Sequence, residues 1–379
     1  MAQFSFVGKI APIKDTENFK GYEEKVYDSG WMSQKLRFNV IAGDNRHLVE
    51  INAGRWKDDS KNSVIYTFSK AEEGKKSEPI QIAWEKRNDP KEIAKVAGYK
   101  VFTIDTDTYQ HRKELEDNGQ DEELEKSNKK RRHFIAGSDF CGFAKKVVES
   151  DKVKDMVFRI NGNVNYSYSE KNDQYYANYE VTKMYRVNDD TEVSSEMNID
   201  FYFAEGAMDG GDYNETSKAI VSGFTPFYDS NTKKSWFAPI SLVLRGETDD
   251  KGKKRVAGYE RIFSKFEDDE IRKISLVCQK IDGAQKADIK FEDLDEETQD
   301  NIVCGLIELE DAIRDAGGQA YGERIQEVRI EKLGRGSSKG SETTAYTLED
   351  CKKKPFKEEE KAVDVSDDYD IFADDEEDI

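Results

Sequence analysis

The sequence contains few of the residues on which many catalytic and metal sites depend. It has three histidines in 379 residues, and His47, His111 and His133 are dispersed without metal-ligand spacing. That scarcity argues against a zinc site or a histidine-based triad. Neither a GxxxxGK[ST] phosphate loop nor a GxGxxG fingerprint occurs. The sequence therefore favours a binding protein over an enzyme and predicts neither a cofactor nor a metal.

Long apolar segments are also missing. No run approaches the roughly 18–20 residues that a membrane span requires, and residues 1–6 lack the basic and apolar regions of a signal peptide. The four cysteines form no CxxC pair, and we expect buried, reduced thiols at Cys141, Cys278, Cys304 and Cys351. These features predict a cytoplasmic protein (host cytoplasm if the gene belongs to a phage) with no membrane partner.

Charge is abundant and unevenly distributed. The formal net charge is −20, but Asp364 to Ile379 holds nine acids and no base, so the rest of the chain carries −11. Basic residues cluster within that remainder at Lys126–Arg132, Lys251–Arg255 and Lys352–Lys357. An acidic protein of this kind can still carry a basic groove.

The ordered part of the chain shows the patterns of strands. Prolines number only six and aromatic residues make up 11%, a composition typical of a folded, strand-rich protein. Ser33–Ile41 alternates apolar and polar residues, Gly43 begins a turn, and His47–Ile51 resumes a strand, which predicts a hairpin. Further strands are predicted at residues 64–68, 80–84, 99–104, 197–203, 236–244, 272–279 and 324–333.

A helix and a second hairpin follow in the first half. Asp139 is the predicted N-cap of a helix whose apolar residues, from Phe140 to Val148, fall at helical spacing. Val157–Tyr168 and Tyr175–Val187 are predicted to be paired strands. A further helix is predicted at 294–316, with Ile302, Leu306, Leu309 and Ile313 as its apolar stripe and Gly317-Gly318 at its end.

Two polar features leave alternatives open. Residues 110–133 contain only two leucines among apolar residues, so this segment is either a solvated helical arm or a mobile loop. The basic run Lys126–Arg132 within it is either a mobile arm that closes over a bound ligand or a plain solvated loop. Asp105 and Asp107 form a DxD pair that would hold Mg²⁺ in a nuclease or transferase. Acidic pairs are common in a chain with 79 Asp and Glu, so a nuclease is the third hypothesis.

The order of these segments resembles that of bacterial and phage single-stranded-DNA-binding proteins. The matching pieces are FCGFAKKVVES from Phe140, VFRINGNVNYSY from Val157 and YYANYEVTKMYRV from Tyr175. FVGKIAPI from Phe6 and SGWMSQKLRFNVIAG from Ser29 resemble the first strands of the same fold. The resemblance implies an oligonucleotide-binding (OB) barrel, elaborated or in tandem, that coats and protects single-stranded DNA during replication or recombination.

The predicted fold class is therefore mainly β with a few helices, divided near Asp189-Asp190. Residues 1–189 form the predicted OB-fold domain, with an insertion at about 57–132 that is longer than in the family. Residues 190–335 form a second β-rich domain, and the sequence does not decide whether it is another OB fold. Residues 336–379 are a predicted flexible linker and acidic tail, because GRGSSKGSETT has a linker composition.

Sequence-independent binding of single strands needs cations for phosphates and flat side chains for bases. The polar faces of the predicted strands offer both kinds of group. The predicted phosphate contacts are Lys35, Arg37, Arg159 and Arg186; the predicted stacking residues are Trp31, Trp56 and Tyr176; and the predicted amide contacts are Asn39, Asn161 and Asn163.

The acidic tail carries Tyr369, Ile371 and Phe372 among its carboxylates. We interpret these three residues as anchors for replication or recombination proteins, with two alternatives left open: a competitor for the DNA groove, or a solubilising tail. The second functional hypothesis for the whole chain is an acidic structural or interaction protein, or an inhibitor that imitates DNA. Such a protein would not bind DNA itself.

Overall fold

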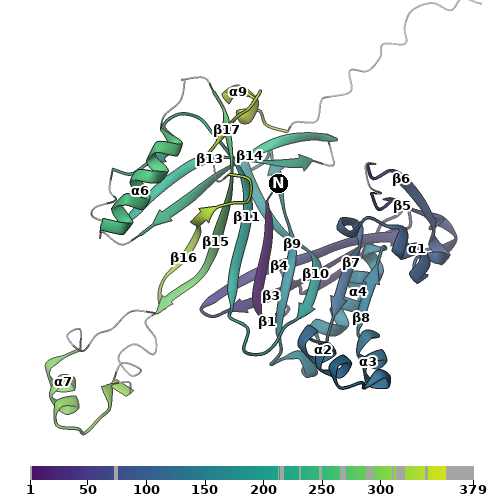
Figure 1. The fold of residues 1–379 in the computed structure, drawn as a ribbon, viewed down its shortest axis with the longest axis horizontal. Coiled ribbons are helices and arrows are strands. Elements are labelled where there is room, and N and C mark those ends of the chain that lie inside the picture. Colours follow the sequence, from purple (N-terminus) through teal and green to yellow (C-terminus); the bar gives the residue numbers. More distant parts are fainter. Residues whose placement is uncertain are drawn as a thin grey trace, which may run out of the picture.

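The computed structural model describes residues 2–71, 76–211, 213, 217–229, 232–246, 250–264, 270–286, 291, 294–309, 311–312, 321–337 and 340–355. Within these ranges the chain is mainly β, as predicted (Figure 1). The strands are β1 (Gln3–Pro12), β2 (Tyr22–Val26), β3 (Trp31–Ala42), β4 (Asn45–Trp56), β5 (Val64–Phe68), β6 (Pro79–Ala83), β7 (Phe102–Asp105), β8 (Arg131–Phe134), β9 (Val157–Ser169), β10 (Gln174–Arg186), β11 (Ser194–Phe203), β12 (Met208–Asp209), β13 (Lys218–Asp229), β14 (Lys234–Arg245), β15 (Arg272–Lys286), β16 (Tyr321–Leu333) and β17 (Glu342–Thr343). The helices are α1 (Pro90–Lys95), α2 (Tyr109–Asp117), α3 (Asp121–Asn128), α4 (Gly137–Val148), α6 (Asp250–Phe263), α7 (Glu296–Val303) and α9 (Leu348–Lys352), with short 3-10 turns at Asp59–Lys61, Trp84–Lys86, Gly98–Lys100 and Asp151–Val153.

Five strands of the first half pair in a closed cycle, referred to below as the first ring. β1 pairs with β3, β3 with β4, β4 with β10, β10 with β9, and β9 again with β1. Every pairing is antiparallel except that of β4 with β10, which is parallel at Glu50 and Glu180. α4 follows β4 and precedes β9 in the chain, and it contacts β3 and β4. Both predicted hairpins of this half, β3–β4 and β9–β10, are confirmed.

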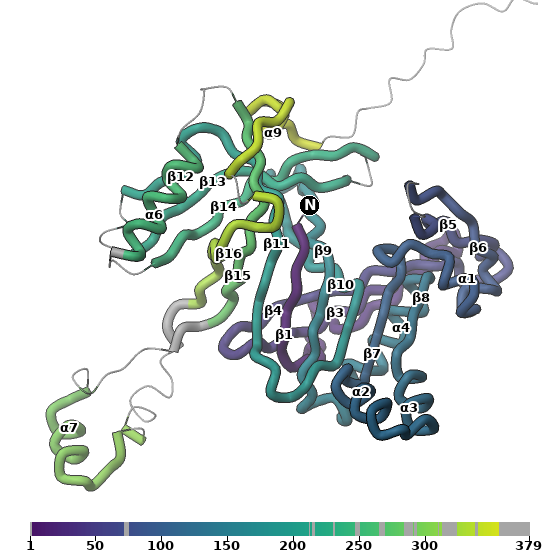
Figure 2. Tube along the Cα trace, in the orientation of Figure 1, coloured from purple at the N-terminus to yellow at the C-terminus, as the bar shows by residue number. Residues whose placement is uncertain are grey.

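Five strands of the second half repeat the same cycle and form the second ring. β11 pairs with β13, β13 with β14, β14 with β16, β16 with β15, and β15 again with β11. The only parallel pairing among these described strands is β14 with β16, at Val243 and Arg329. α6 occupies the place in the chain that α4 has in the first ring, between the third and fourth strands. Figure 2 shows this helix beside β13 and β14.

The two rings are connected by strand pairing and a shared core, and not only by the chain between them. β1 also pairs with β11, so fifteen described strands form one continuous sheet. The Nε2 atom of buried His47 in β4 lies 2.6 Å from the Oγ atom of Ser195 in β11. Apolar residues of both rings, among them Phe158 and Phe201, belong to one core cluster. The predicted boundary at Asp189-Asp190 lies between β10 and β11, and the division into two domains remains a prediction.

α4 forms where the helical spacing predicts it, although it does not begin as predicted. Phe140, Ala144 and Val148 are buried against the first ring. The predicted N-cap at Asp139 is wrong, because the helix begins at Gly137 and Asp139 lies inside its first turn. The Asp139 carboxylate instead accepts a hydrogen bond from the Arg87 guanidinium at 2.8 Å.

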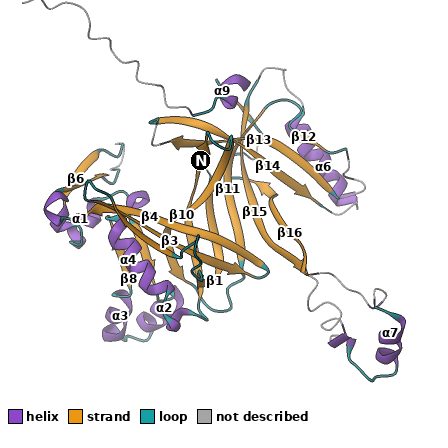
Figure 3. Cartoon of the chain, turned by 180° about the vertical axis from the view of Figure 1, so that it is seen from behind, coloured by secondary structure: helices purple, strands orange, loops and turns teal. Residues whose placement is uncertain are grey.

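The structure also tests the predictions for residues 110–133 and 294–316. Most of residues 110–133 is helical, in α2 and α3, and the last residues belong to β8, so the mobile-loop alternative is wrong for this segment (Figure 3). The helix predicted at 294–316 is interrupted, because α7 ends at Val303 and a turn follows before residues 309, 311 and 312 are helical again. Leu306 beyond it is 72% exposed, so the apolar spacing there does not report a buried helix face. Ile313 and Gly317-Gly318 lie outside the described residues.

Two further expectations concern the burial of the cysteines and the presence of membrane-spanning helices. Cys141, Cys278 and Cys351 are buried free thiols, but Cys304 is exposed, so the prediction of burial is wrong there. In the described ranges of the chain, no helix is both long and apolar enough to cross a membrane.

Candidate nucleic-acid interface

The outer face of the first ring carries most of the predicted contact residues. On β3 the buried residues alternate with Trp31, Lys35, Arg37 and Asn39, which therefore share the opposite, solvent-facing side. This arrangement follows from the two-residue period of a strand. The alternation read from the sequence thus placed these four side chains on one face.

Trp31 and Trp56 form a cross-strand pair at one end of this face. They are in register on β3 and β4, and their rings lie 5.4 Å apart in an edge-to-face arrangement. A Cβ atom at Gly54 would lie 2.4 Å from Cζ2 of Trp31, so only glycine lets the indole lie against β4. Both rings line a hollow of about 340 Å³, referred to below as the tryptophan hollow, whose lining also includes Tyr66 and Trp84.

The centre of the face combines cations with two carboxylates. The Lys35 ammonium lies 3.3 Å from the Glu50 carboxylate, and Arg37 lies 3.0 Å from Glu23 and 4.0 Å from Glu50. Glu50 is also the parallel bridge partner of Glu180. Burial and the negative charge of Glu50 raise the pKa of Glu180. Lys35 and Arg37 are thus partly engaged by acids of the protein itself.

A β-bulge decides which residues of β10 face outward. The pairing of β9 with β10 shifts register between Val181 and Lys183, and a bulge of this kind reverses the side on which later residues lie. Beyond it, Lys183 is in register with Asn161, and Tyr185 with the exposed Arg159. Before it, Asn163 is in register with Glu180.

The bulge separates Arg186 from the other predicted contacts. Arg186 is in register with Phe158, which is fully buried, and therefore shares its side of the sheet. Its Nε atom is buried without a hydrogen-bond partner among the described groups. Tyr176 faces outward and is 42% exposed, but it lies near the β9–β10 turn, where its hydroxyl accepts a hydrogen bond from Asn172 at 2.9 Å.

Lys183 and Tyr185 extend the face toward β7 and β8. Lys183 pairs with Thr103 of β7, which pairs with His133 of β8. These residues line a hollow of about 740 Å³, referred to below as the basic hollow. Its cationic and aromatic lining residues include Lys70, Arg131, Arg132, His133, Lys183 and Tyr185. Burial and the charge of Arg131 lower the pKa of His133, so this ring is neutral at pH 7.

The two hollows are neighbours along the chain. β8 lines the basic hollow, and residues 135–138, which follow β8, line the tryptophan hollow. Between them, Ile135 packs with Ile82 and Val96 of the insertion in a small apolar cluster. The insertion at about 57–132 therefore forms one wall of each hollow.

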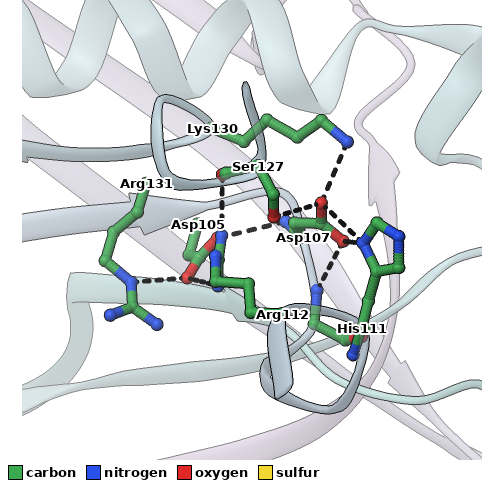
Figure 4. Close-up of polar contacts among 8 residues, drawn as sticks. Asp105, Asp107, His111, Arg112, Ser127, Lys130 and Arg131 are labelled. Carbon is green, nitrogen blue, oxygen red and sulfur yellow. Dashed lines mark hydrogen bonds and ion pairs between the residues drawn. The ribbon is translucent and has the colours of Figure 1, made fainter. Parts of the chain in front are cut away.

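Asp105 and Asp107 are already occupied by protein cations, which removes the basis for a magnesium site (Figure 4). Asp105 binds Arg112 through both carboxylate oxygens, at 2.6 and 2.9 Å, and Arg131 at 2.7 Å. Asp107 accepts hydrogen bonds from Ser127 at 2.8 Å and Lys130 at 2.9 Å. No cluster of three or more metal-ligating side chains occurs in the described part of the chain.

The same contacts correct the expectation of a free basic arm. Burial opposes ionisation of Asp107, but its hydrogen bonds, above all that from Lys130, lower its pKa. Ser127 is buried, Arg131 binds Asp105 at the end of β7, and Lys130 binds Asp107 just beyond it, so the chain after α3 is held against β7. The run Lys126–Arg132 thus fastens the α2–α3 hairpin, and neither an arm nor a plain solvated loop describes it.

Sequence reasoning missed several residues of this face. Lys183 and Tyr185 lie inside a predicted strand but are not among the predicted contacts, because the bulge that turns them outward leaves no clear signal in the sequence. Tyr66 and Trp84 belong to the insertion, and their distance along the chain from Trp31 gave no reason to place them together. The predicted partner residues Tyr369, Ile371 and Phe372 lie outside the described residues.

Comparisons with known proteins give one group of similar structures. No family model matches the chain, and no curated protein matches it. Among solved structures, it is similar to the wild-type single-stranded DNA binding protein from Thermus aquaticus and to a deletion mutant of that protein. The alignments cover 88% of this chain and 92% and 94% of the others, at 6% and 7% identity and a TM-score of 0.31 in each case. At that TM-score the likeness carries no conclusion about this chain.

Proposed function

We propose that this chain consists of two OB folds in tandem and binds single-stranded DNA without catalysing a reaction on it. A five-stranded Greek-key barrel with a helix between its third and fourth strands is the OB architecture. Both rings have five strands in the corresponding pairing order, with α4 and α6 in that position. The protein would coat and protect exposed strands during replication or recombination.

The observation that carries the proposal is the pairing of free cations with aromatic rings on one outer face. Arg159 and Lys183 have no carboxylate partner in the described part of the chain. Arg159 is in register with Tyr185 and Lys183 with Asn161, so both residues of each pair face the same side of the sheet. Phosphates provide the anions that such cations attract, and bases stack on rings such as those of Tyr185, Trp31 and Trp56. We infer that a strand runs across β9 and β10, past the basic hollow, toward the tryptophan pair.

A second candidate is favoured by the carboxylates in the middle of that face. Glu50 and Glu180 meet at the β4–β10 bridge, and their charges repel phosphate. Together with the net charge of −20, they suit an acidic structural or interaction protein, or a DNA mimic, that binds a basic protein partner. A mimic does not bind DNA, so one titration separates the two functions.

The test is a titration of tryptophan fluorescence with oligo-dT, a duplex and an RNA of matched length. Trp31 and Trp56 lie on the proposed face, so bound bases should quench their emission. We expect tighter binding to the single strand than to the duplex, with log affinity falling by roughly 0.7 per phosphate contact for each decade of salt. Absence of binding to oligo-dT at low salt, measured also by anisotropy of labelled DNA, would reject the proposal and favour the mimic.

We further propose that the acidic tail recruits replication or recombination proteins. Lys354, close to the end of the described chain, donates a hydrogen bond to Asp173 in the β9–β10 turn. The described chain therefore ends beside the β9–β10 turn, close to the turn that precedes Tyr176. Deletion of residues 364–379 should leave affinity for oligo-dT unchanged or slightly raised. A large gain would instead support the competitor alternative.

Ile371→Ala together with Phe372→Ala should abolish capture of a partner protein in a pull-down. The control is Ala substitution of Asp367 and Asp368, which removes charge but keeps the anchors. If the anchor variant captured the same proteins as the full chain, the tail would be a solubility device.

A further inference from the structure

The tryptophan hollow combines an aromatic wall with a region suited to an anion. Three of the four tryptophans of the chain line it, although Trp84 is separated in sequence from Trp31 and Trp56. Tyr66, which is 76% exposed, belongs to the same lining. Its volume of about 340 Å³ falls within the roughly 300–1,000 Å³ of small-molecule sites. A cluster of rings at such a place suits a planar heterocycle.

The start of α4 provides the region suited to an anion. Gly137 and Ser138 line the hollow, and in the described chain no side chain caps this twelve-residue helix. Free N–H groups and the helix dipole make such a terminus attractive to phosphate. Ser138 is 6% exposed, and its hydroxyl oxygen is buried with no hydrogen-bond partner among the described groups. A buried hydroxyl normally has a partner, so the Ser138 hydroxyl is an unsatisfied polar group in a residue that lines the hollow.

The charges around the hollow leave one cation available. Arg55 is held by Asp59 at 2.9 Å, and the carboxylate of Asp139 is held by Arg87. Lys61 also lines the hollow, and its ammonium lies 5.5 Å from the centre of the Trp56 ring. Within the described part of the chain no carboxylate forms a close ion pair with Lys61, although its charge acts on the carboxylate of Asp58. A phosphate at the start of α4 would therefore lie in the same hollow as this lysine.

We propose that the tryptophan hollow binds a nucleoside 5′-phosphate, with the base against the tryptophans and the phosphate at the start of α4. This inference rests on the proposed function and deepens it by giving the single strand a polarity. The ligand is either a free nucleotide or the phosphorylated 5′ end of a strand. Ser138 donates its hydroxyl proton to the phosphate, and Lys61 supplies the counter-charge.

Calorimetric titration of the full chain with thymidine 5′-monophosphate and with thymidine tests the phosphate contact. Parallel titrations with short oligo-dT, with and without a 5′-phosphate, distinguish the free nucleotide from the strand end. We expect the phosphate to strengthen binding of the nucleotide, of the oligonucleotide, or of both, by about tenfold. Equal affinity with and without phosphate in both pairs would overturn the inference.

Two variants test the location. Ser138→Ala should weaken binding of the phosphorylated ligand by about tenfold, without lowering the melting temperature, because the hydroxyl has no partner in the free protein. Lys61→Glu should weaken it by more than tenfold. Lys57→Glu is the matched control. Lys57 is exposed and does not line the tryptophan hollow, and its substitution changes the net charge by the same amount. Equal losses in the Lys61 and Lys57 variants would overturn the assignment.

Binding of long oligo-dT separates the two levels of the proposal. If the wild-type chain binds long oligo-dT but neither phosphorylated ligand more tightly than its unphosphorylated counterpart, the hollow is not a 5′-phosphate site and the proposed function stands. If long oligo-dT does not bind at all, the proposed function falls first. Retention of long oligo-dT binding by Ser138→Ala, with loss of the preference for phosphate, would support both.

Discussion

The two rings share one pairing order but differ in how their outer charges are compensated. On the fourth and fifth strands of the second ring, Asp282 accepts hydrogen bonds from Arg324, and Glu327 accepts them from Arg245 and Arg329. Burial opposes ionisation of Glu327, but hydrogen bonds from these two arginines and a lysine lower its pKa to about 2. Arg245, Arg324 and Arg329 are thus engaged by carboxylates of their own ring.

The corresponding strands of the first ring, β9 and β10, are different. Arg159 and Lys183 lack acidic partners in the described chain, whereas the nearby carboxylate of Glu180 has a raised pKa. One pairing order therefore supports a cluster of paired arginines and carboxylates in one ring and unpaired Arg159 and Lys183 among the described residues of the other. The comparison indicates that topology sets the scaffold and that individual side chains decide where a polyanion can bind.

The largest predicted loss of stability tests whether the two rings unfold independently. Phe158→Ala in the first ring and Phe201→Ala in the second each remove a fully buried ring and should cost about 3–5 kcal/mol of stability. Because one core and one sheet connect the rings, we expect both variants to shift the same single calorimetric transition. Two transitions, each moved by only one variant, would show that the rings unfold separately and would support the predicted two-domain division.

The contact between the rings should make stability depend on pH. Burial and the charge of Lys280 lower the pKa of His47 to about 4 from an ordinary value of 6.5. The folded protein therefore favours the neutral ring. Its contribution to stability is complete above pH 6.5 and is lost as the pH falls toward 4, by roughly 2–4 kcal/mol.

Urea unfolding at several pH values measures this dependence. His47→Gln is the comparison, because the glutamine amide can still donate to Ser195 but does not titrate. The difference in unfolding free energy between wild type and variant should change between pH 6.5 and 4. A constant difference across this range would mean that His47 is not the titrating group.

A double substitution tests the spare cations. Arg159→Ala with Lys183→Ala should weaken binding of oligo-dT by roughly tenfold or more at low salt and reduce the salt slope by about 0.7 per lost contact. Thermal stability should change little, since these groups have no partners to lose. The matched control is Arg261→Ala with Lys332→Ala, two exposed cations of the second half. An equal loss of affinity in the control would erase the proposed distinction between the rings.

The smallest predicted changes in stability and in affinity for oligo-dT come from the adjacent carboxylates of Glu50 and Glu180. Glu180→Gln relieves repulsion across the β4–β10 bridge, where like charges in register cost roughly 0.2–1 kcal/mol. We expect a slight gain in stability at pH 7 that fades below the raised pKa of Glu180, together with a modest gain in affinity for oligo-dT. Glu170→Gln, an exposed acid in the β9–β10 turn, controls for net charge. A loss of affinity in Glu180→Gln would instead assign this carboxylate a direct role in binding.

Alternation and helical spacing predicted the parts of the first ring that bury one face. The β3–β4 hairpin and α4 are examples, because apolar residues such as Phe38 and Phe140 must all reach the same core. The α2–α3 hairpin gave no such signal, since Arg112 and Asp105 replace apolar packing beneath it. A salt bridge between residues of two elements has no sequence period.

The second ring was harder to predict. β13 contains Gly223 and Pro226, residues that usually argue against a strand. Gly223 is required there, because a Cβ atom would lie 2.4 Å from the Phe201 ring. In the first ring, the bulge near Lys183 reversed the expected face of Arg186. Both errors arise from close contacts between strands distant in the sequence, which local patterns do not contain.

The position of β1 has a consequence for how the chain is synthesised. Gln3 pairs on one side with Asn163 and on the other with Asn198, and the later part of β1 pairs with β3. Neither edge partner exists until most of the first half has left the ribosome, and contacts so distant in sequence slow folding. During translation β1 is therefore an unpaired strand with exposed apolar residues, the kind of segment that aggregates or engages chaperones. The strand that joins the two rings is made before its partners in β9 and β11 and should be among the last to reach its native contacts.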